Sequence, residues 1–241
     1  MSEITRRERM RVETDLEIRQ HARRLLVAEG REAVTLRAIA RELGITAPAL
    51  YRYYDSREDM LRQLCVDICD DLADELNRAL EEVGEDDYRE KLFTVCRGFR
   101  RWALGHPREF TLVFASPADE TGTDTGEPAQ DQLGSVFLRV IGPLMSEGAT
   151  QVVNEGAPSD LHNDLAPNQE ALAAAFTIKG IEVPEEATGP HAVYFLLRWW
   201  IRIYGHVALE VFRRFPFDVA HADRLFESLL TELTQDVGLD G

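Results

Sequence analysis

The stretch LRAIARELGITAPALYRYYDSREDML, residues 36–61, decides how the N-terminal part of this chain folds. Thr35 stands where a hydroxyl would cap a helix over Leu36–Leu43. Gly44 follows directly, and glycine ends helices because it accepts the left-handed backbone that the next residue needs. The pattern therefore predicts a short helix that stops at a tight turn.

A second, very short helix is predicted after this turn. Thr46 would cap it, and Pro48 falls in its first turn, where the missing N–H costs nothing. Leu50 and Tyr54 are spaced to point back into a core. Two short helices around a glycine turn have the layout of a helix-turn-helix, whose second helix can lie in the major groove of DNA.

The residues on the outer side of this second helix separate a DNA-binding unit from a plain helical hairpin. Ala47 and Ala49 are small enough for the backbone to approach bases closely, and Tyr51, Arg52 and Tyr53 follow at once. Tyrosine hydroxyls and arginines suit phosphate oxygens. Core packing is the alternative for the two tyrosines, and at Tyr53 the two readings are about equally supported.

The segment TLRAIARELGITAPALYRYYDSREDML, preceded by LLVAEG, resembles the N-terminal DNA-binding domain of the TetR family of transcriptional repressors. The resemblance implies that Tyr51 and Arg57 bind phosphates and that Arg37 reaches a base edge or a phosphate. Because Ala47 and Ala49 cannot donate hydrogen bonds to bases, direct readout would fall to Arg37, Arg52 and apolar contacts. The complete set of expected DNA-binding residues is Arg37, Thr46, Ala47, Pro48, Ala49, Tyr51, Arg52, Tyr53 and Arg57.

The chain before this segment is predicted to be a flexible arm followed by a helix. Thr14 and Glu17 have the spacing of a capping box, so the helix is expected to run from Thr14 to Gly30. Residues 1–13 would then be the arm, with its arginines either touching the minor groove or neighbouring phosphates, or simply solvated. These arginines are Arg6, Arg7, Arg9 and Arg11.

Helical periodicity dominates the rest of the chain, so the expected fold class is all-α. Residues 14–64 form the expected helix-turn-helix domain, with Ser56 capping its last helix, and residues 65–241 form a larger helical domain. The predicted helices of that domain span 88–104, 107–115, 132–153, 191–215 and 218–237. Loops are predicted over 116–131, which is acidic and rich in Gly, Pro and Thr, and over 154–169.

The larger domain resembles a common C-terminal subtype of the same family in FRRWALGHPREFTLVFA (99–115) and WIRIYGHVALEV (200–211), although Tyr204 stands where a histidine is usual. The resemblance implies a small-molecule effector and a homodimer. Aromatic crowding suggests which side chains line an effector site, although any single one of these aromatic residues more often fills a core. The candidates are Phe99, Trp102, Phe110, Phe114, Phe195, Trp199 and Arg202.

Two apolar stripes near the C-terminal end predict a four-helix bundle between two copies of the chain. The stripes are Leu196, Trp200, Ile203, Val207 and Val211, then Leu225, Leu229 and Leu233. A dimer would bring two recognition helices to two half-sites of a palindromic DNA operator.

Charge and composition narrow the function classes. The formal net charge is −16, yet residues 1–64 hold 13 arginines against 11 acidic residues, so basic character gathers at one end. No apolar run is long enough for a membrane span, no secretory signal opens the chain, and three cysteines make no disulfide framework, which together predict a cytosolic protein. No catalytic or metal-binding motif is found, so neither an enzyme nor a cofactor is expected. Two alternative functions stay open: a TetR-like activator or global regulator, and a helical ligand-binding or interaction protein that has lost specific DNA binding.

Overall fold

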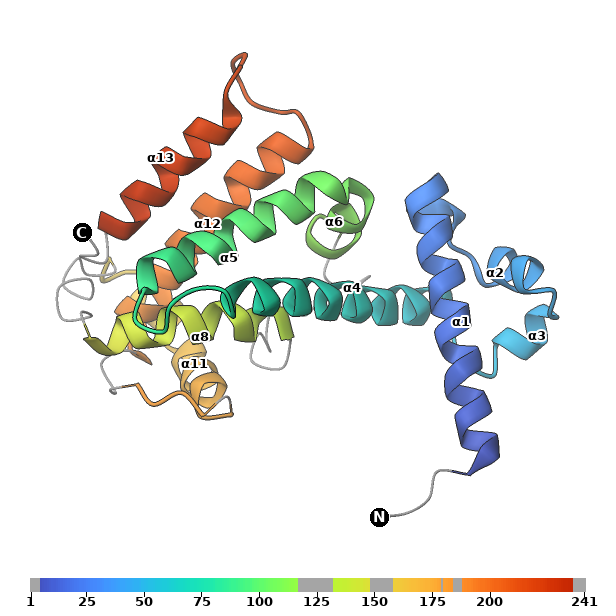
Figure 1. Cartoon of the computed structure of the whole chain (residues 1–241). Helices are drawn as coiled ribbons and strands as arrows, with labels where there is room; N and C mark the ends of the chain where they lie inside the picture. The colour runs from blue at the N-terminus through green and yellow to red at the C-terminus, as the bar shows by residue number, and fades with distance from the viewer. Residues whose placement is uncertain (1–4, 117–131, 148–157, 179, 184–187, 236–241) are drawn as a thin grey trace. The chain divides into compact units, whose positions relative to one another are not determined.

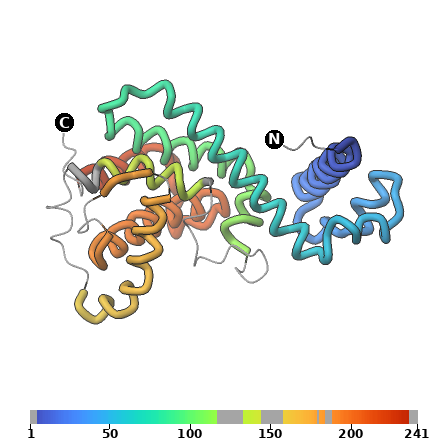
Figure 2. Tube along the Cα trace, turned by 90° about the horizontal axis from the view of Figure 1, so that it is seen from below, coloured from blue at the N-terminus to red at the C-terminus, as the bar shows by residue number. Residues whose placement is uncertain are grey.

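The computed structural model describes residues 5–116, 132–147, 158–178, 180–183 and 188–235, and all regular structure within them is helical (Figure 1). The predicted all-α fold class is therefore confirmed. Figure 2 follows the same order of elements along the Cα trace. The elements are α1 (Arg6–Glu29), the 3₁₀ turn η1 (Arg31–Ala33), α2 (Leu36–Leu43), α3 (Ala47–Leu50), α4 (Arg57–Leu80), α5 (Tyr88–Gly105), α6 (Pro107–Phe114), α8 (Gln132–Glu147), α10 (His162–Leu165), α11 (Pro167–Ile178), α12 (Pro190–Val211) and α13 (Ala222–Gln235).

The chain divides into two compact units. The first contains Met1–Cys69 and His106–Thr125, and the second contains Asp70–Gly105 and Gly126–Gly241. The boundary falls within α4, and the chain returns to the first unit at α6. Nothing in the local sequence pattern indicated this return, because it depends on contacts between residues far apart along the chain.

Helix α1 begins at Arg6, so the predicted start at Thr14 is wrong. Thr5 caps the helix with a complete capping box: the Thr5 amide donates to the Glu8 carboxylate at 2.7 Å, and the Glu8 amide donates to the Thr5 hydroxyl at 3.3 Å. The Thr14 hydroxyl instead donates to the Met10 carbonyl at 2.9 Å inside the helix. Two segments share the Thr-x-x-Glu pattern and no breaker lies between them, so the earlier one caps the helix. Residues 6–13 are therefore helical.

The predicted helices around the glycine turn are confirmed. The Thr35 hydroxyl accepts a hydrogen bond from the Ala38 amide at 3.1 Å, and Gly44 is left-handed, with φ 67° and ψ 22°. Thr46 occupies the N-cap position of α3, but its side chain makes no capping hydrogen bond. Leu50 is fully buried, which holds α3 against the rest of the first unit.

The second unit is built around α5, which packs against α8, α12 and α13. A Cβ atom added to Gly98 of α5 would lie 2.4 Å from the Leu76 side chain, so a larger residue there would require the leucine to move. Arg97 of α5 donates two hydrogen bonds to Glu227 of α13, at 2.9 and 2.7 Å.

Three boundaries in the second unit differ clearly from prediction, and the first is the start of α13 at Ala222 instead of Asp218. The predicted loop over residues 154–169 contains α10 and the start of α11, because Leu165 is buried and anchors a short helix there. Helix α12 ends at Val211 instead of Phe215, because Phe212 has the cap position and Arg213 adopts a positive φ of 54°. Most of the predicted loop 116–131 lies outside the described residues.

Candidate nucleic-acid interface and the helical core

Helix α3 presents one buried and one exposed side. Leu50 is fully buried, whereas the next residue, Tyr51, keeps 53% of its surface exposed. Thr46, Pro48 and Arg52 are also exposed. An exposed tyrosine next to a buried leucine is held at the surface with its hydroxyl free to reach a ligand.

Arg37 on α2 is exposed as well, and Ala47 and Ala49 are half-buried. Because α2 and α3 pack together, eight of the nine predicted DNA-binding residues come from one helix pair and its exit turn. The ninth is Arg57, in the first turn of α4.

Tyr54, which follows the exit turn, anchors α3 to α1. Its ring is buried, and its hydroxyl donates to the Asp15 carboxylate at 2.6 Å. Burial and this carboxylate raise the pKa of Tyr54 well above its ordinary value, so the phenol keeps its proton. Arg19 also contacts Asp15, at 3.4 Å, and bonds Asp67 of α4 at 2.5 Å. This network joins the recognition helix to both long helices of the first unit.

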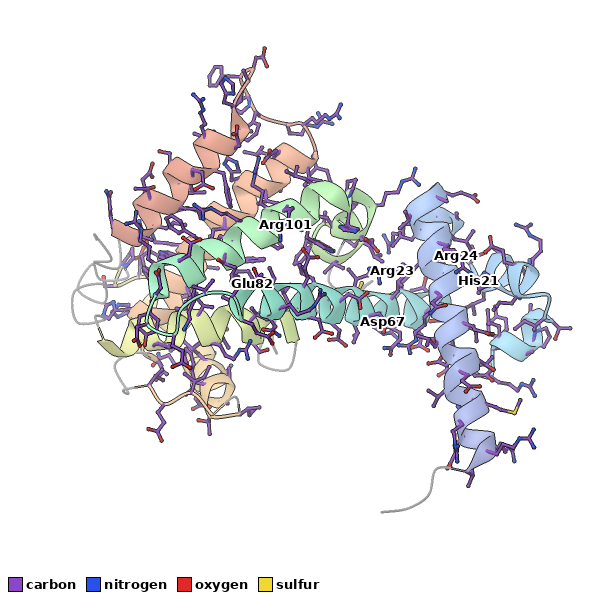
Figure 3. All side chains as sticks on the ribbon, viewed as in Figure 1. His21, Arg23, Arg24, Asp67, Glu82 and Arg101 are labelled. Carbon is purple, nitrogen blue, oxygen red and sulfur yellow. The ribbon has the colours of Figure 1, made fainter. Side chains whose placement is uncertain are left out.

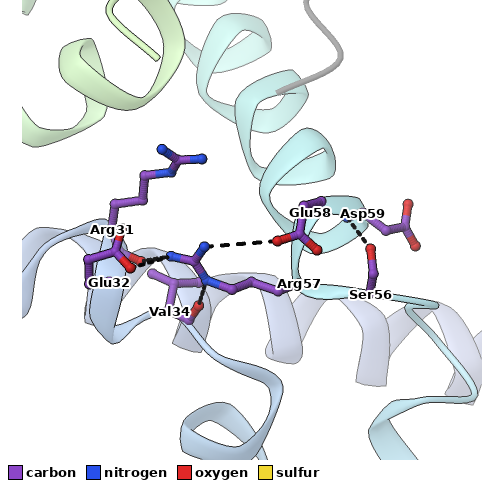
Figure 4. Close-up of polar contacts among 7 residues, drawn as sticks. All are labelled: Arg31, Glu32, Val34, Ser56, Arg57, Glu58 and Asp59. Atoms are coloured by element: carbon purple, nitrogen blue, oxygen red, sulfur yellow. Dashed lines mark hydrogen bonds and ion pairs between the residues drawn. The ribbon is translucent and has the colours of Figure 1, made fainter. Parts of the chain in front are cut away.

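The Arg57 side chain forms hydrogen bonds within the first unit (Figure 4). Its Nε donates to the Val34 carbonyl at 2.9 Å, and its Nη2 donates to the Arg31 carbonyl at 2.8 Å. The Glu32 carboxylate lies 3.4 Å from the same Nη2. These bonds hold the connection between α1 and α2, so the structure supplies a positioning role that sequence reasoning missed, and the phosphate contact stays a prediction.

Helix α6 is tied to α1 by a buried ion pair. Glu109 of α6 is only 2% exposed, and Arg23 of α1 donates from Nε to its Oε1 at 2.5 Å. Arg23 is labelled on α1 in Figure 3. Phe110 and Phe114 of α6 pack together, with ring centroids 5.3 Å apart. These two predicted effector residues therefore belong to the first unit.

The other aromatic candidates lie in the second unit in separate groups. Phe99 is fully buried and packs on Phe137 and Trp200, with centroid distances of 6.3 and 5.7 Å. Trp102 is also buried. Sequence reasoning missed Phe137 as a partner of Phe99, and only the 3.6-residue period of its helix hinted at an inward position.

Phe195 and Trp199 form the second aromatic group, on α12, with centroids 5.2 Å apart. Trp199 is buried, and its indole N–H has no acceptor among the residues that the structure describes. Arg202 donates to Glu232 of α13 at 2.8 Å. Arg202 therefore forms an ion pair between α12 and α13, and its role at an effector site stays a prediction.

A histidine that the candidate list omitted is buried beside an ion pair. His206 of α12 has its Nε2 3.6 Å from Glu210, which accepts two hydrogen bonds from Arg100 of α5, at 2.7 and 2.6 Å. The Arg100 guanidinium also lies over the Phe226 ring of α13. Burial lowers the pKa of His206 below its ordinary value, outweighing the opposing effect of the Glu210 charge.

We expect the second unit to lose stability as the pH falls below about 6.5, the ordinary pKa of histidine. The unfolded chain then binds a proton that folded His206 resists, so the free energy of unfolding decreases by up to about 1.4 kcal/mol per pH unit. Urea unfolding followed by tryptophan fluorescence between pH 5.5 and 7.5 measures this slope. The variant His206→Gln should show a smaller slope of unfolding free energy against pH. An unchanged slope in that variant would mean that another titratable group causes the pH dependence.

Two protein-family models match the chain. The model described as "Bacterial regulatory proteins, tetR family" matches residues 18–64. The model described as "Tetracyclin repressor-like, C-terminal domain" matches residues 92–233, more than half of the chain. The two matches cover the helix-turn-helix and most of the second unit, and residues 65–91, which include most of α4, lie between them in sequence.

Relatives of the same kind cover nearly all of the chain. HTH-type transcriptional regulator Rv1816 from Mycobacterium tuberculosis (strain ATCC 25618 / H37Rv) is 27% identical over 218 residues, which cover 90% of this chain and 88% of the relative. HTH-type transcriptional regulator Mb1846 from Mycobacterium bovis (strain ATCC BAA-935 / AF2122/97) matches with the same values. The crystal structure of the protein SCO4313 has a TM-score of 0.62 at 25% identity, over 96% of this chain and all of that one.

None of the described helices combines the length and apolar character needed to cross a membrane.

Proposed function

The chain belongs to the TetR family of bacterial transcriptional regulators, and from that premise we propose that it is a cytosolic homodimeric repressor that a small-molecule effector releases from a palindromic DNA operator. The observation that carries the proposal is the exposed Tyr51 directly after α3, next to fully buried Leu50. Hydroxyls held at a recognition helix suit phosphate oxygens, and such contacts fix the register of the helix on DNA.

An exposed apolar face of α12 supports the dimer. Leu197, Ile201 and Leu209 are exposed, and with Gly205 they recur at every fourth residue. A side chain at Gly205 would meet open space, so a second helix can approach closely there. Ridges of residues spaced by four are the commonest surface for packing two helices, and the second copy of the same chain is the proposed occupant.

This face replaces the stripe that sequence periodicity predicted. Ile203 and Val207 of α12 and Leu233 of α13 are buried within the protomer, so their assignment to a dimer seam is wrong. Periodicity identifies apolar faces of a helix but does not say which face the protomer itself covers. Helix α12 has apolar residues on nearly all sides, so the sequence alone could not show which side faces a second copy of the chain.

The Trp199 N–H supports an effector site in the second unit. A buried indole N–H without an acceptor among the described residues costs free energy, which a bound acceptor would recover. Phe195 beside it supplies apolar surface for the same ligand. We infer an uncharged or acidic effector with a hydrogen-bond acceptor, coupled to DNA binding by about 1–3 kcal/mol.

Fluorescence anisotropy of labelled DNA tests the proposed function. The probe is a duplex from the intergenic region upstream of the gene for this protein, with a scrambled duplex as control, at two salt concentrations. Preference for the intergenic duplex with a steep salt dependence supports the regulator. Failure of a folded dimer to bind either duplex would favour the alternative, a ligand-binding or interaction protein without DNA affinity.

Substitutions of Tyr51 and Arg37 separate anchoring from sequence readout. Tyr51→Ala should weaken binding to both duplexes by about tenfold and leave the salt dependence nearly unchanged, because a contact of a neutral hydroxyl to phosphate is lost for any sequence. Arg37→Ala should weaken binding to the preferred duplex more than to the scrambled one, because a base contact is lost. Equal losses on both duplexes in both variants would contradict this division of roles.

A further inference from the structure

The N-terminal turns of α1 continue a helix face that is buried further along the same helix. Within the domain this face consists of Ile18, Ala22 and Leu25, which are all buried. Counting back from Ile18 at helical spacing, the same face carries Arg11 and Arg7. Figure 1 shows that the N-terminal end of α1 extends past α3, and Arg7 and Arg11 belong to the first two turns of this helix. Both are exposed.

Arg11 connects this basic face to the recognition helix. Its guanidinium carbon lies 5.9 Å from the centroid of the Tyr53 ring, in the turn that leaves α3. Tyr53 is two residues from exposed Tyr51 and directly precedes Tyr54, which is bonded to Asp15 of α1 at 2.6 Å. The tyrosine turn and the first turns of α1 are thus fastened to each other, and the guanidinium is held instead of free to rotate.

The acidic residues of these turns do not neutralise the Arg7–Arg11 face. The Glu8 carboxylate is turned to the helix start, where it accepts hydrogen bonds from both the amide and the hydroxyl of Thr5, at 2.7 and 2.8 Å. Those hydrogen bonds lower the pKa of Glu8, so its charge stays next to the positive end of the helix dipole. Glu13 lies on the opposite side of the helix by spacing, as do Arg6 and Arg9.

We propose that Arg7 and Arg11 form a second DNA-binding surface, which contacts backbone phosphates next to those contacted by the recognition helix. The proposal rests on the proposed function and names residues that neither the family resemblance nor the helix-turn-helix pattern assigns. Two arginines on a rigid helix are better placed than two in a disordered arm, because less conformational entropy is lost when they bind. The capping box at Thr5 and Glu8 is what makes this part of the chain helical.

The experiment compares two double substitutions of equal charge on the same two turns. Arg7→Ala/Arg11→Ala removes the proposed surface, and Arg6→Ala/Arg9→Ala removes the same charge from the other side of the helix. Anisotropy is measured across a salt series with the intergenic and the scrambled duplex. We expect the first variant to bind both duplexes about tenfold more weakly, with a slope of log affinity against log salt that is less steep by about 2, since each phosphate contact contributes about 0.9.

The control double substitution should keep the wild-type slope. Equal changes of slope in both variants would show a general charge effect and overturn the proposal, as would an unchanged slope in the first variant. Arg7→Lys/Arg11→Lys should restore most of the slope while losing the planar stacking of Arg11 on Tyr53. If far-UV circular dichroism shows that the alanine variant is misfolded, the lysine variant and the control decide the question.

The failure of this inference is distinguishable from failure of the proposed function. A wild-type protein that binds neither duplex overturns both. A wild-type protein that prefers the intergenic duplex, together with an Arg7→Ala/Arg11→Ala variant that binds as wild type, overturns only the second surface.

Discussion

Ile201→Glu will convert the protein to a monomer and lower its affinity for a palindromic duplex by about 10²- to 10⁴-fold, the factor that linking two binding modules supplies. Ile201 keeps 57% of its surface exposed on α12, between Leu197 and Gly205 of the same face. A glutamate there would place two like charges close together at the two-fold axis of a dimer, where neither has a partner. Ile201 is far along the chain from the recognition helix, so this substitution would lower DNA affinity only by preventing dimerisation.

The matched control is Ile178→Glu, the same change at the end of α11. Ile178 is 65% exposed, so the glutamate is accommodated equally well, but it is not on the α12 face. Light scattering during size-exclusion chromatography gives the mass of each variant, and anisotropy gives its affinity. A dimeric Ile201→Glu protein, or a monomeric one with undiminished affinity for the palindrome, would show that this face does not assemble the DNA-binding form.

The helix-turn-helix could be predicted because its signals are local. Thr35 caps α2 through a contact three residues away, and Gly44 ends the helix by its own backbone conformation. Leu50 and Tyr54 are buried as their spacing indicated. A pattern that short needs no knowledge of the rest of the chain.

The features that sequence reasoning missed depend on distant partners. From the sequence, Arg57 is predicted to be a basic residue near DNA. In the structure it donates hydrogen bonds to the carbonyls of Val34 and Arg31, which are 23 and 26 residues earlier in the chain. Glu109 reads as a surface acid in the first turn of a helix, and its burial arises from Arg23, 86 residues away. Which apolar face of α12 stays exposed depends on how α5, α8 and α13 pack against its other faces, and the sequence of α12 alone does not contain that information.

Arg23→Leu will lower the free energy of unfolding of the first unit by about 3 kcal/mol, because it leaves the Glu109 carboxylate buried without a counter-charge. The carboxylate is 2% exposed and its second oxygen has no hydrogen-bond partner among the described residues. His106, with its Nε2 4.0 Å away, is too distant for a hydrogen bond. This loss of stability lies at the lower end of the range of about 3–5 kcal/mol seen when one partner of a buried ion pair is removed. The reason is that the Arg23 side chain is 29% exposed.

The neighbouring Arg24→Leu is the control, because Arg24 is exposed and the same charge is removed from the same helix (Figure 3). It should change the free energy of unfolding by less than about 0.5 kcal/mol. All three tryptophans, Trp102, Trp199 and Trp200, lie in the second unit, so their fluorescence reports that unit alone while far-UV circular dichroism reports both. Arg23→Leu should therefore unfold at lower urea by circular dichroism than by fluorescence.

The double variant Arg23→Leu/Glu109→Leu then separates the cost of an orphaned charge from the value of the pair. Apolar side chains of similar volume remove both charges, so the double variant should recover most of the lost stability. If it stays as unstable as Arg23→Leu, the arginine stabilises α6 by packing and by its other contacts instead of by neutralising Glu109. Recovery would mean that α1 and α6 hold together through apolar contact, with the ion pair selecting one register between them.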